Sequence, residues 1–420
     1  MLESQKDVVV SKLRSPHFTI SLLLLFALPN LLFVSVGFTS LAPGLLLACT
    51  AILLVNFRDL FKFRFSTNGF LMLFAMFVCA FVFGAHIYLS SGENKSLISL
   101  LFFFVIAVAV VLGNSVINVG FYAFNKTLVF VLTLLLILGW VKLFWQPDFL
   151  RYGEYSKPVF PFSEESHYSL FLGMIACGVI VNLSATASAI LIVNMLALAI
   201  LMPNLTLLVF VCMCSLLLLL RVRLIYFWVV LIVAASILGF FFYFVLLDNE
   251  YFKSRLDFSG SENLTALVFL QGWALAYANF TGTFGLGLGF QMLGSSYTFL
   301  PEISEVIYRH AGQYFNVADA GFLAAKLIAE LGVLGLLLSA TYMVLLVRVI
   351  FVINYWSRRS RKMRGADCLL AKKYVAASAL VFGFLVEFFF RGLGYFSPGV
   401  FLFIFAFTIY LKSKALLREI

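Results

Sequence analysis

Apolar residues fill long, uninterrupted runs along most of this 420-residue chain instead of alternating with polar residues. A run of about 20 apolar residues has the length of a helix that crosses the hydrocarbon core of a bilayer. Lipid cannot hydrogen-bond the backbone, so a span must be a helix or part of a closed barrel, and continuous runs select helices. The pattern predicts an all-α fold, a polytopic transmembrane helical bundle in which residues 1–420 form one integral membrane domain.

About twelve transmembrane helices can be drawn through these runs. They are expected at residues 17–37, 41–57, 69–90, 96–112, 127–145, 167–184, 186–202, 204–220, 224–247, 320–347, 374–390 and 398–411. The crowded stretch 167–220 has an alternative division into two long helices in place of three short ones. The first run follows three cations, as in a signal peptide, but it exceeds a signal h-region and no small-residue cleavage site closes it. We therefore expect a retained first helix.

Composition and charge agree with a membrane protein. Apolar residues make up 63% of the chain and charged residues 11%, against about 45–50% and about 25% in soluble domains. The net charge of +10 could suit nucleic acid or anionic lipid. With both termini in the cytoplasm, however, most Lys and Arg fall in cytoplasmic segments, as the positive-inside rule requires. The basic cytoplasmic loop 348–373 is thus expected to anchor the topology, with binding of lipid headgroups as the alternative and no nucleic acid as partner.

Two outer segments stand out by length, 142–166 and the large, partly helical loop 248–319, which holds charged and aromatic residues together. In the large loop, Ser261 is a candidate N-cap for a helix that runs to Phe280 along the membrane surface or in an outer cavity. The glycine-rich stretch 282–290 lacks the strand, helix and lysine of a nucleotide-binding loop, so a flexible turn with close backbone approach is expected there.

Cysteines and histidines give no sign of a metal site or a disulfide framework. The six cysteines fall in predicted spans or in the cytoplasmic loop. The four histidines lack metal-ligand spacing and there is no HExxH motif. Neither a metal nor another cofactor is expected.

The first candidate for chemistry is FSEESHYSLF, at the start of the sixth predicted helix. Ser163 as N-cap, with Glu164 and Glu165 in the first turn, is what a helix start favours electrostatically. Glu164 and His167 are also one turn apart, so carboxylates and an imidazole could act as a base or bind sugar hydroxyls. Capping and catalysis are compatible.

The second candidate is an ionisable stripe at the start of the tenth predicted helix. At 100° per residue, Asp319, Lys326 and Glu330 fall on one face, and the last two lie at depths where an unpaired charge is costly. Either Lys326 and Glu330 form a self-satisfied salt bridge that fixes packing, or the three residues line a polar cavity under the large loop.

The third candidate is a set of arginines on the predicted outer side. Arg391 follows Glu387 by four residues, the favourable order for an ion pair. With Arg151, Arg255 and Arg309 it forms a set of guanidiniums suited to clamping phosphates. The alternative for each is a surface charge.

Three stretches together resemble the O-antigen and capsular polysaccharide repeat-unit polymerases (Wzy type) of the bacterial inner membrane. They are FSEESHYSLF at 162–171, similar to a Glu-Pro-Ser-His-Phe-like pattern of that family, 255–289 with WALAYANFTGTFGLGLG, and DAGFLAAKLIAELGVLGLLL at 319–338. The resemblance covers most of the chain from about residue 140 onward. This chain has Glu165 where the family commonly has a proline, and its spacing from Arg309 to Gly321 exceeds the arginine–glycine signature of some members.

The resemblance implies a glycosyltransferase that polymerises undecaprenyl-pyrophosphate-linked repeat units at the periplasmic face of the inner membrane, without metal or cofactor. Cations would stabilise the leaving pyrophosphate while a base activates the acceptor hydroxyl. The base candidates, in order, are Glu165, His167, Asp319 and His310. The pyrophosphate- and substrate-binding candidates are Arg151, Arg255, Arg309, Arg391, Tyr308, Glu164 and Lys326. The bilayer, a chain-length regulator and a flippase are the expected partners.

Two other functions stay open from the sequence. An O-antigen ligase, which transfers glycan to lipid A core, shares the helix number and the large outer loop, and His310 beside Arg309 suits it. A flippase or other transporter of lipid-linked oligosaccharide should concentrate cations in helices around a central cavity and keep its loops short. The charges of loop 248–319 favour surface chemistry over translocation.

Overall fold

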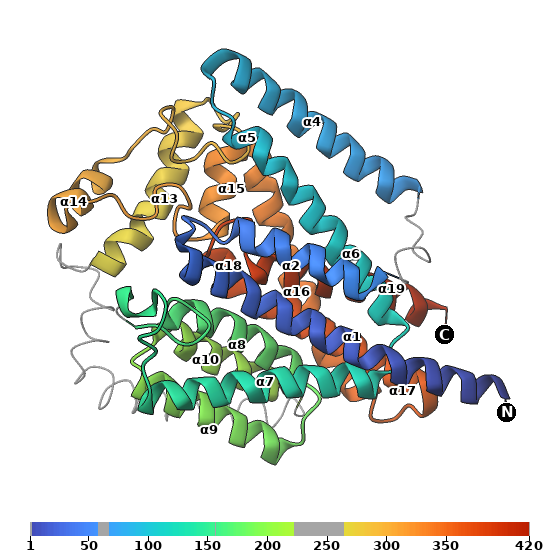
Figure 1. The fold of residues 1–420 in the computed structure, drawn as a ribbon. Helices are drawn as coiled ribbons and strands as arrows, with labels where there is room; N and C mark the ends of the chain where they lie inside the picture. The colour runs from blue at the N-terminus through green and yellow to red at the C-terminus, as the bar shows by residue number, and fades with distance from the viewer. Residues whose placement is uncertain (1, 58–66, 156, 222–263, 420) are drawn as a thin grey trace.

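The computed structural model describes residues 2–57, 67–155, 157–221 and 264–419, which form a bundle of helices (Figure 1). No β-strand occurs among these residues, whose only extended pairing is an isolated bridge between Val159 and Phe162. The predicted all-α class is confirmed.

The long helices follow the apolar runs. Seven helical segments in the described part are long and apolar enough to cross a membrane: 16–37 in α1 (Leu2–Leu32) and its π-helical extension η1 (Phe33–Gly37), 73–90 in α4 (Thr67–Ser91), 95–117 in α5 (Lys95–Ile98), η2 (Ser99–Leu101) and α6 (Phe102–Ile117), α7 (Phe121–Phe144), α16 (Val333–Arg359), 365–389 in α17 (Gly365–Gly383) and α18 (Leu385–Phe389), and α19 (Pro398–Arg418). Each overlaps a predicted span, although α16 begins and ends more than ten residues later than the span predicted at 320–347.

Four further apolar helices are shorter: α2 (Ala42–Val55), α8 (Glu165–Ile180), α9 (Ala185–Leu201) and α10 (Leu205–Leu220). The stretch 167–220 therefore contains three short helices and not two long ones. Asn204 separates the last two because its side chain caps α10 by accepting the Leu207 N–H at 3.0 Å. The span predicted at 224–247 lies outside the described residues.

The remaining helices lie near one end of the bundle. They are η3 (Tyr152–Glu154), α13 (Leu264–Gly282), α14 (Glu302–Ala311) and α15 (Leu323–Leu331). Figure 1 places α13, α14 and α15 together with α5 at the upper left, whereas both chain termini lie at the lower right. The helix predicted within 248–319 is α13, although its predicted cap, Ser261, lies outside the described residues.

Small residues allow the central helices to pack closely. A Cβ on Gly113 of α6 would lie 2.8 Å from Thr408 of α19, and a Cβ on Gly178 of α8 would lie 2.6 Å from Leu380 of α17. Such contacts are a common way to bring helices together in lipid, where burial of apolar side chains gives little net driving force. By contrast, α4 lies at the edge of the bundle (Figure 1), and most of its apolar span is exposed.

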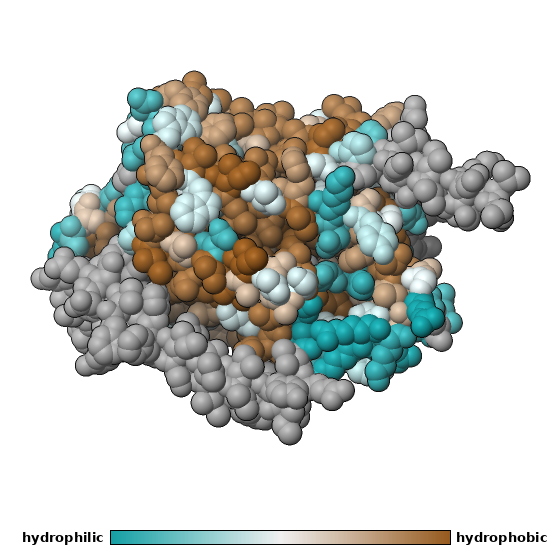
Figure 2. Space-filling model, turned by 90° about the horizontal axis from the view of Figure 1, so that it is seen from below, coloured by the Kyte–Doolittle hydropathy of each residue, from teal (hydrophilic) through white to brown (hydrophobic). Residues whose placement is uncertain are grey.

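At the end of the bundle that is predicted to face the cytoplasm, cationic side chains cap the C-termini of helices. The Arg221 guanidinium donates to the Ile180 carbonyl at 2.8 Å, at the end of α8, and the buried Lys373 donates to the Ile117 carbonyl at 2.9 Å, at the end of α6. Both neutralise carbonyls that a helix C-terminus leaves unpaired. The predicted loop 348–373 is mostly helical, because α16 and α17 continue into it. Figure 2 shows a hydrophilic patch beside the apolar surface, on the side of the termini in Figure 1.

Candidate functional site

The first polar cluster, which we call the arginine cluster, consists of Ser163, Glu164, His167 and Arg391. One carboxylate oxygen of Glu164 receives two partners, His167 Nε2 at 2.6 Å and Arg391 Nη2 at 2.7 Å. The other imidazole nitrogen, Nδ1, lies 3.1 Å from the Ser163 hydroxyl. The Glu164 carboxylate thus orients the His167 imidazole, and the Arg391 guanidinium compensates the negative charge of Glu164.

The start of α8 positions this cluster. The helix begins at Glu165, so Glu164 is the extended N-cap residue and Ser163, the predicted cap, contacts His167 instead. Burial alone would raise the pKa of Glu164, but His167 and Arg391 together hold it well below its ordinary value. Glu164 is therefore ionised while it contacts His167 and Arg391.

Glu165 points to a different neighbour. Its carboxylate lies 3.9 Å from Lys142 Nζ at the end of α7, and its side chain is 11% exposed. Burial is the main influence and raises the pKa of Glu165 from 4.5 to about 7, although Lys157 and Lys142 act in the opposite direction. Glu165, the first-ranked base candidate, therefore contacts Lys142 and not the Glu164–His167 pair.

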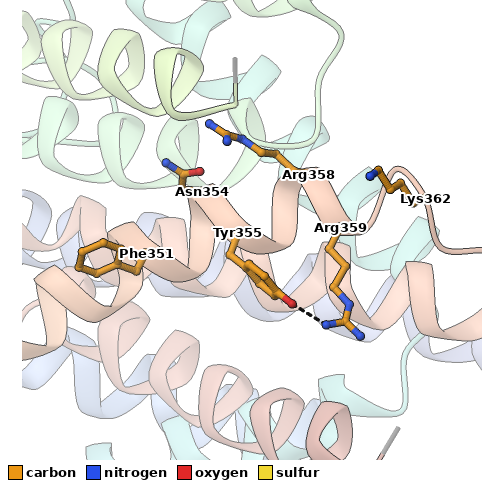
Figure 3. A pocket seen from close by; sticks show the side chains of 6 residues that line it. All are labelled: Phe351, Asn354, Tyr355, Arg358, Arg359 and Lys362. Carbon is orange, nitrogen blue, oxygen red and sulfur yellow. Dashed lines mark hydrogen bonds between the residues drawn. The ribbon is translucent and has the colours of Figure 1, made fainter. Parts of the chain in front are cut away.

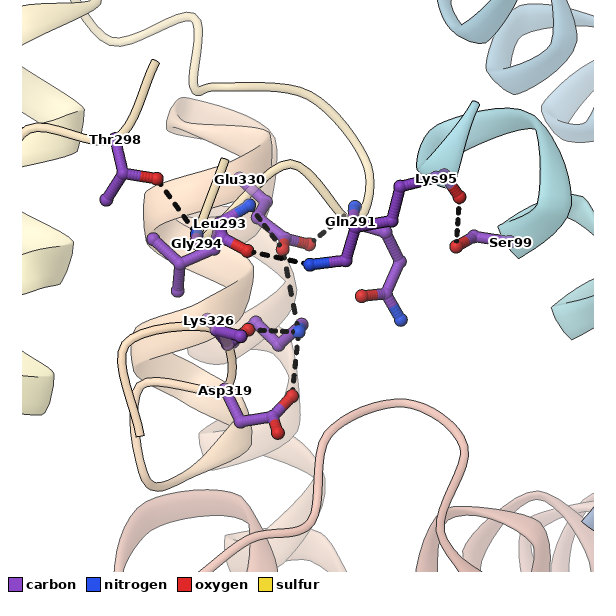
Figure 4. Close-up of polar contacts among 10 residues, drawn as sticks. Lys95, Ser99, Gln291, Leu293, Gly294, Thr298, Asp319, Lys326 and Glu330 are labelled. Carbon is purple, nitrogen blue, oxygen red and sulfur yellow. Dashed lines mark hydrogen bonds and ion pairs between the residues drawn. The ribbon is translucent and has the colours of Figure 1, made fainter. Parts of the chain in front are cut away.

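The second polar cluster, the lysine cluster, is centred on Lys326 (Figure 4). Its ammonium lies 2.9 Å from Asp319 Oδ1, 2.6 Å from the Ala318 carbonyl and 3.6 Å from Glu330 Oε1. Lys326 and Glu330 are fully buried, whereas the Asp319 side chain is 49% exposed. The predicted association of Asp319, Lys326 and Glu330 is confirmed, and Asp319 forms its open end.

Backbone amides complete the shell of Glu330. Its two carboxylate oxygens accept the Gln291 N–H at 2.9 Å and the Leu293 N–H at 3.1 Å. These amides follow the glycine-rich stretch, whose backbone pairs with α15 through Gly289 N and the Glu330 carbonyl at 2.7 Å. The close backbone approach expected of that stretch is present, and it stabilises a buried carboxylate.

The loop between α18 and α19, residues 390–397, connects the two clusters. Arg391 in this loop reaches Glu164, and the next residue, Gly392, donates its N–H to the Gly321 carbonyl at 2.7 Å. The segment that carries Asp319 is therefore fixed to the segment that carries Arg391.

The same loop also touches the lysine cluster. A Cβ on Gly394 would lie 2.6 Å from Asp319 Oδ1, so only glycine allows this approach. The Tyr395 ring centroid lies 5.3 Å from Lys326 Nζ, within the range of a cation–π contact. Lys95 adds a further cation at the start of α5, where it donates to the Leu293 carbonyl at 3.0 Å (Figure 4).

Three predicted site residues lie together on α14. Their hydrogen bonds and ring contacts in the described part of the chain are with other residues of α14 and its vicinity, and not with the two clusters. Tyr308, Arg309 and His310 are exposed at the end of this helix. His310 Nδ1 lies 2.9 Å from the Val306 carbonyl of the same helix, and Tyr308 stacks on Tyr314 at 4.8 Å. Within the described residues, no hydrogen bond or ion pair joins Arg309 to the clusters.

The other two predicted arginines do not join the clusters either. Arg151 forms a local ion pair with Glu154 at 2.7 Å on an exposed surface. Arg255 lies outside the described residues, so its place in the site stays a prediction. Of the predicted guanidiniums in the described part, Arg391 alone pairs with another predicted site residue.

Two local expectations were wrong. Arg391 was expected to pair with Glu387, but α18 ends at Phe389 and the i,i+4 geometry is lost, so Glu387 instead contacts the Ser397 hydroxyl. Asp319 was expected on the same helical face as Lys326 and Glu330, with the helix starting at about residue 320, but α15 begins at Leu323. Asp319 therefore reaches Lys326 from the turn before α15 and not from the helix itself.

Sequence reasoning missed Lys95, Gln291, Leu293, Gly394 and Tyr395 as members of the site. None of these five residues was indicated in advance, because backbone amide donors and single aromatic rings leave no pattern in sequence. Among the described residues, no group of three or more His, Cys, Asp or Glu is arranged to hold a metal ion. No family model, curated protein or solved structure matches this chain.

Proposed function

We propose that this chain is a membrane glycosyltransferase that polymerises lipid-linked oligosaccharide repeat units, carried on undecaprenyl pyrophosphate, into O-antigen or capsular polysaccharide. The proposal includes about twelve membrane spans, cytoplasmic termini and an active site at the periplasmic face of a bacterial inner membrane. The observation that carries it is the sharing of one Glu164 oxygen between His167 and Arg391.

The arginine cluster contains the two functions that such a transfer needs. The acceptor hydroxyl needs a base, and the Glu164–His167 pair can take its proton as the hydroxyl oxygen bonds to the donor sugar C1. The C1–O bond to the lipid diphosphate then breaks, and the diphosphate leaves with the bonding electron pair. A cation beside the leaving group stabilises the charge that develops there.

Arg391 is suited to that second task. Its Nη2 pairs with Glu164, while its Nε is buried and has no hydrogen-bond partner within the described part of the chain. A planar guanidinium offers further donors in a fixed fork that matches phosphate oxygens. Its side chain is 34% exposed, which leaves room for a ligand to approach.

The contacts change the order of the base candidates. His167, oriented by Glu164, is placed first, because Glu165 faces Lys142 and His310 lies on the exposed end of α14. Asp319 comes next, since the lysine cluster holds it beside the loop that carries Arg391. Lys326 is assigned the role of positioning Asp319, because it is fully buried.

The test is complementation of a strain that lacks this chain, with its surface glycan separated by gel electrophoresis. A lost polymerase leaves core bearing a single repeat unit, and the wild-type chain should restore a ladder. His167→Gln and Arg391→Gln should each leave the single-repeat pattern at normal protein level.

Arg151→Gln is the matched control, because Arg151 also pairs with a glutamate but does not join the clusters. It should restore a full ladder. Bare core in the deletion strain would indicate a lost ligase or flippase and would reject polymerisation. Full ladders from both His167→Gln and Arg391→Gln would remove the arginine cluster from the reaction.

A further inference from the structure

A basic groove lies at the far end of α16 from the break that separates it from α15. It has a volume of about 520 Å³ and is lined by Phe351, Asn354, Tyr355, Arg358, Arg359 and Lys362 (Figure 3). These residues belong to the last turns of α16 and to the turn toward α17. The arginine and lysine clusters do not contribute to it.

Among the described residues that line the groove, three are cations and none carries a carboxylate. Arg359 and Lys362 are exposed, and the Arg359 guanidinium is held by the Tyr355 hydroxyl at 2.5 Å and by the Trp356 ring at 5.1 Å. This ring contact and single hydrogen bond fix the guanidinium while leaving most of its five N–H donors for a ligand. The site is therefore preorganised for a phosphate oxygen.

An apolar stripe on α16 leads to the groove. Val344, Val347 and Phe351 lie three or four positions apart, so they share one face, and their exposed fractions are 52%, 52% and 70%. Tyr355 continues the stripe by one turn and Arg359 by another. The exposed Arg348 lies beside Val347 on this face, and the other side chains form an apolar surface that ends at the fixed Arg359 guanidinium. This surface matches a molecule with hydrocarbon chains and an anionic head.

We infer that this groove binds the phosphate headgroup of an anionic phospholipid, whose acyl chains lie along the exposed stripe of α16. Because α16 is long and apolar enough to span a bilayer, its basic end meets the membrane–water interface, where such headgroups are found. The inference uses residues at the opposite end of α16 from the proposed catalytic groups, and it does not depend on the proposed function.

The test is native mass spectrometry of the full chain, delipidated in detergent and titrated with phosphatidylglycerol or with phosphatidylcholine of the same acyl chains. The wild-type chain should bind phosphatidylglycerol more tightly. The double variant Arg359→Gln/Lys362→Gln should lose roughly 10- to 30-fold in affinity for phosphatidylglycerol, since each cation near a membrane surface contributes appreciably to anionic lipid binding.

The matched control is Lys412→Gln/Lys414→Gln, which removes two cations of α19 that do not line the groove. It should keep wild-type affinity. Excess inorganic phosphate should compete weakly, because it lacks the acyl chains.

Three results would overturn the inference. They are equal binding of the two lipids by the wild-type chain, equal loss in the two double variants, and full displacement by inorganic phosphate, which would indicate a site for a free anion. The comparison of lipids on the wild-type chain decides the matter even where a variant folds poorly.

Discussion

At the scale of single residues, two neighbouring glutamates show how position decides chemistry. Glu164 is held ionised by His167 and Arg391, whereas burial raises the pKa of Glu165 to about 7. The sequence placed both at a helix start, where either could cap or catalyse. Only the helix register, which turns Glu165 toward α7, separates their roles.

The raised pKa of Glu165 predicts a pH dependence of stability. The folded chain keeps a proton there that the unfolded chain has released above about pH 4.5, so stability falls as the pH rises from about 4.5 to about 7. Glu165→Gln should remove this dependence and raise stability at pH 8 by about 1–3 kcal/mol. The readout is the thermal unfolding midpoint in detergent between pH 5 and pH 8.

Asp148→Asn serves as the control for Glu165→Gln, since it removes an exposed carboxylate from the same segment. It should keep the wild-type profile. An unchanged slope in Glu165→Gln would show that this carboxyl is not the source of the dependence.

At the scale of elements, the break between α15 and α16 shapes the lysine cluster. Gly332 interrupts an apolar run that was predicted as one helix, and the backbone of Gly285 accepts the Val333 N–H at 2.8 Å across the break. The glycine-rich stretch thus lies directly on the interrupted helix. The break leaves Glu330 near the end of α15, where loop amides reach its carboxylate.

This packing predicts unequal effects for two glycines with similar backbone angles. Gly287 has φ +82° and its Cβ would collide with the Glu330 carbonyl, whereas Gly312 has φ +70° with nothing within 4 Å. Gly312→Ala should cost about 1–2 kcal/mol for the left-handed conformation alone. Gly287→Ala should cost at least about 3 kcal/mol, because overpacking adds to that strain.

Thermal unfolding midpoints of the two glycine variants in detergent provide the comparison. Equal losses of stability would mean that the glycine-rich stretch does not press against α15. A larger loss in Gly312→Ala would contradict the packing outright.

The sequence predictions were accurate for interactions between residues close in the chain and failed for interactions between residues far apart in it. Apolar runs predicted the long helices because span length is a local property, and Lys326 with Glu330 was predicted because four positions make one helical turn. The pairing of Arg391 with Glu164 crosses 227 positions and leaves no local pattern. The break at Gly332 was missed because the residues around it are as apolar as a helix interior.

At the scale of the whole molecule, charge is divided between the two ends of an apolar bundle. One end uses cations to cap helices and to form the basic groove, and the other joins carboxylates, an imidazole and an arginine through the loop 390–397. Buried and half-buried charges at the second end are expensive unless they are paired, and here Glu164 pairs with Arg391 and Glu330 pairs with Lys326. We assign the chemistry to that end.

The most direct test is transfer by the purified chain in liposomes, supplied with lipid-linked repeat units extracted from a strain that lacks it. We predict a ladder of products and released lipid diphosphate with the wild-type chain and with Arg151→Gln, and at least a 100-fold lower rate, about 2.7 kcal/mol, with Arg391→Gln. A wild-type rate in Arg391→Gln, or no transfer by folded wild-type chain, would contradict the account.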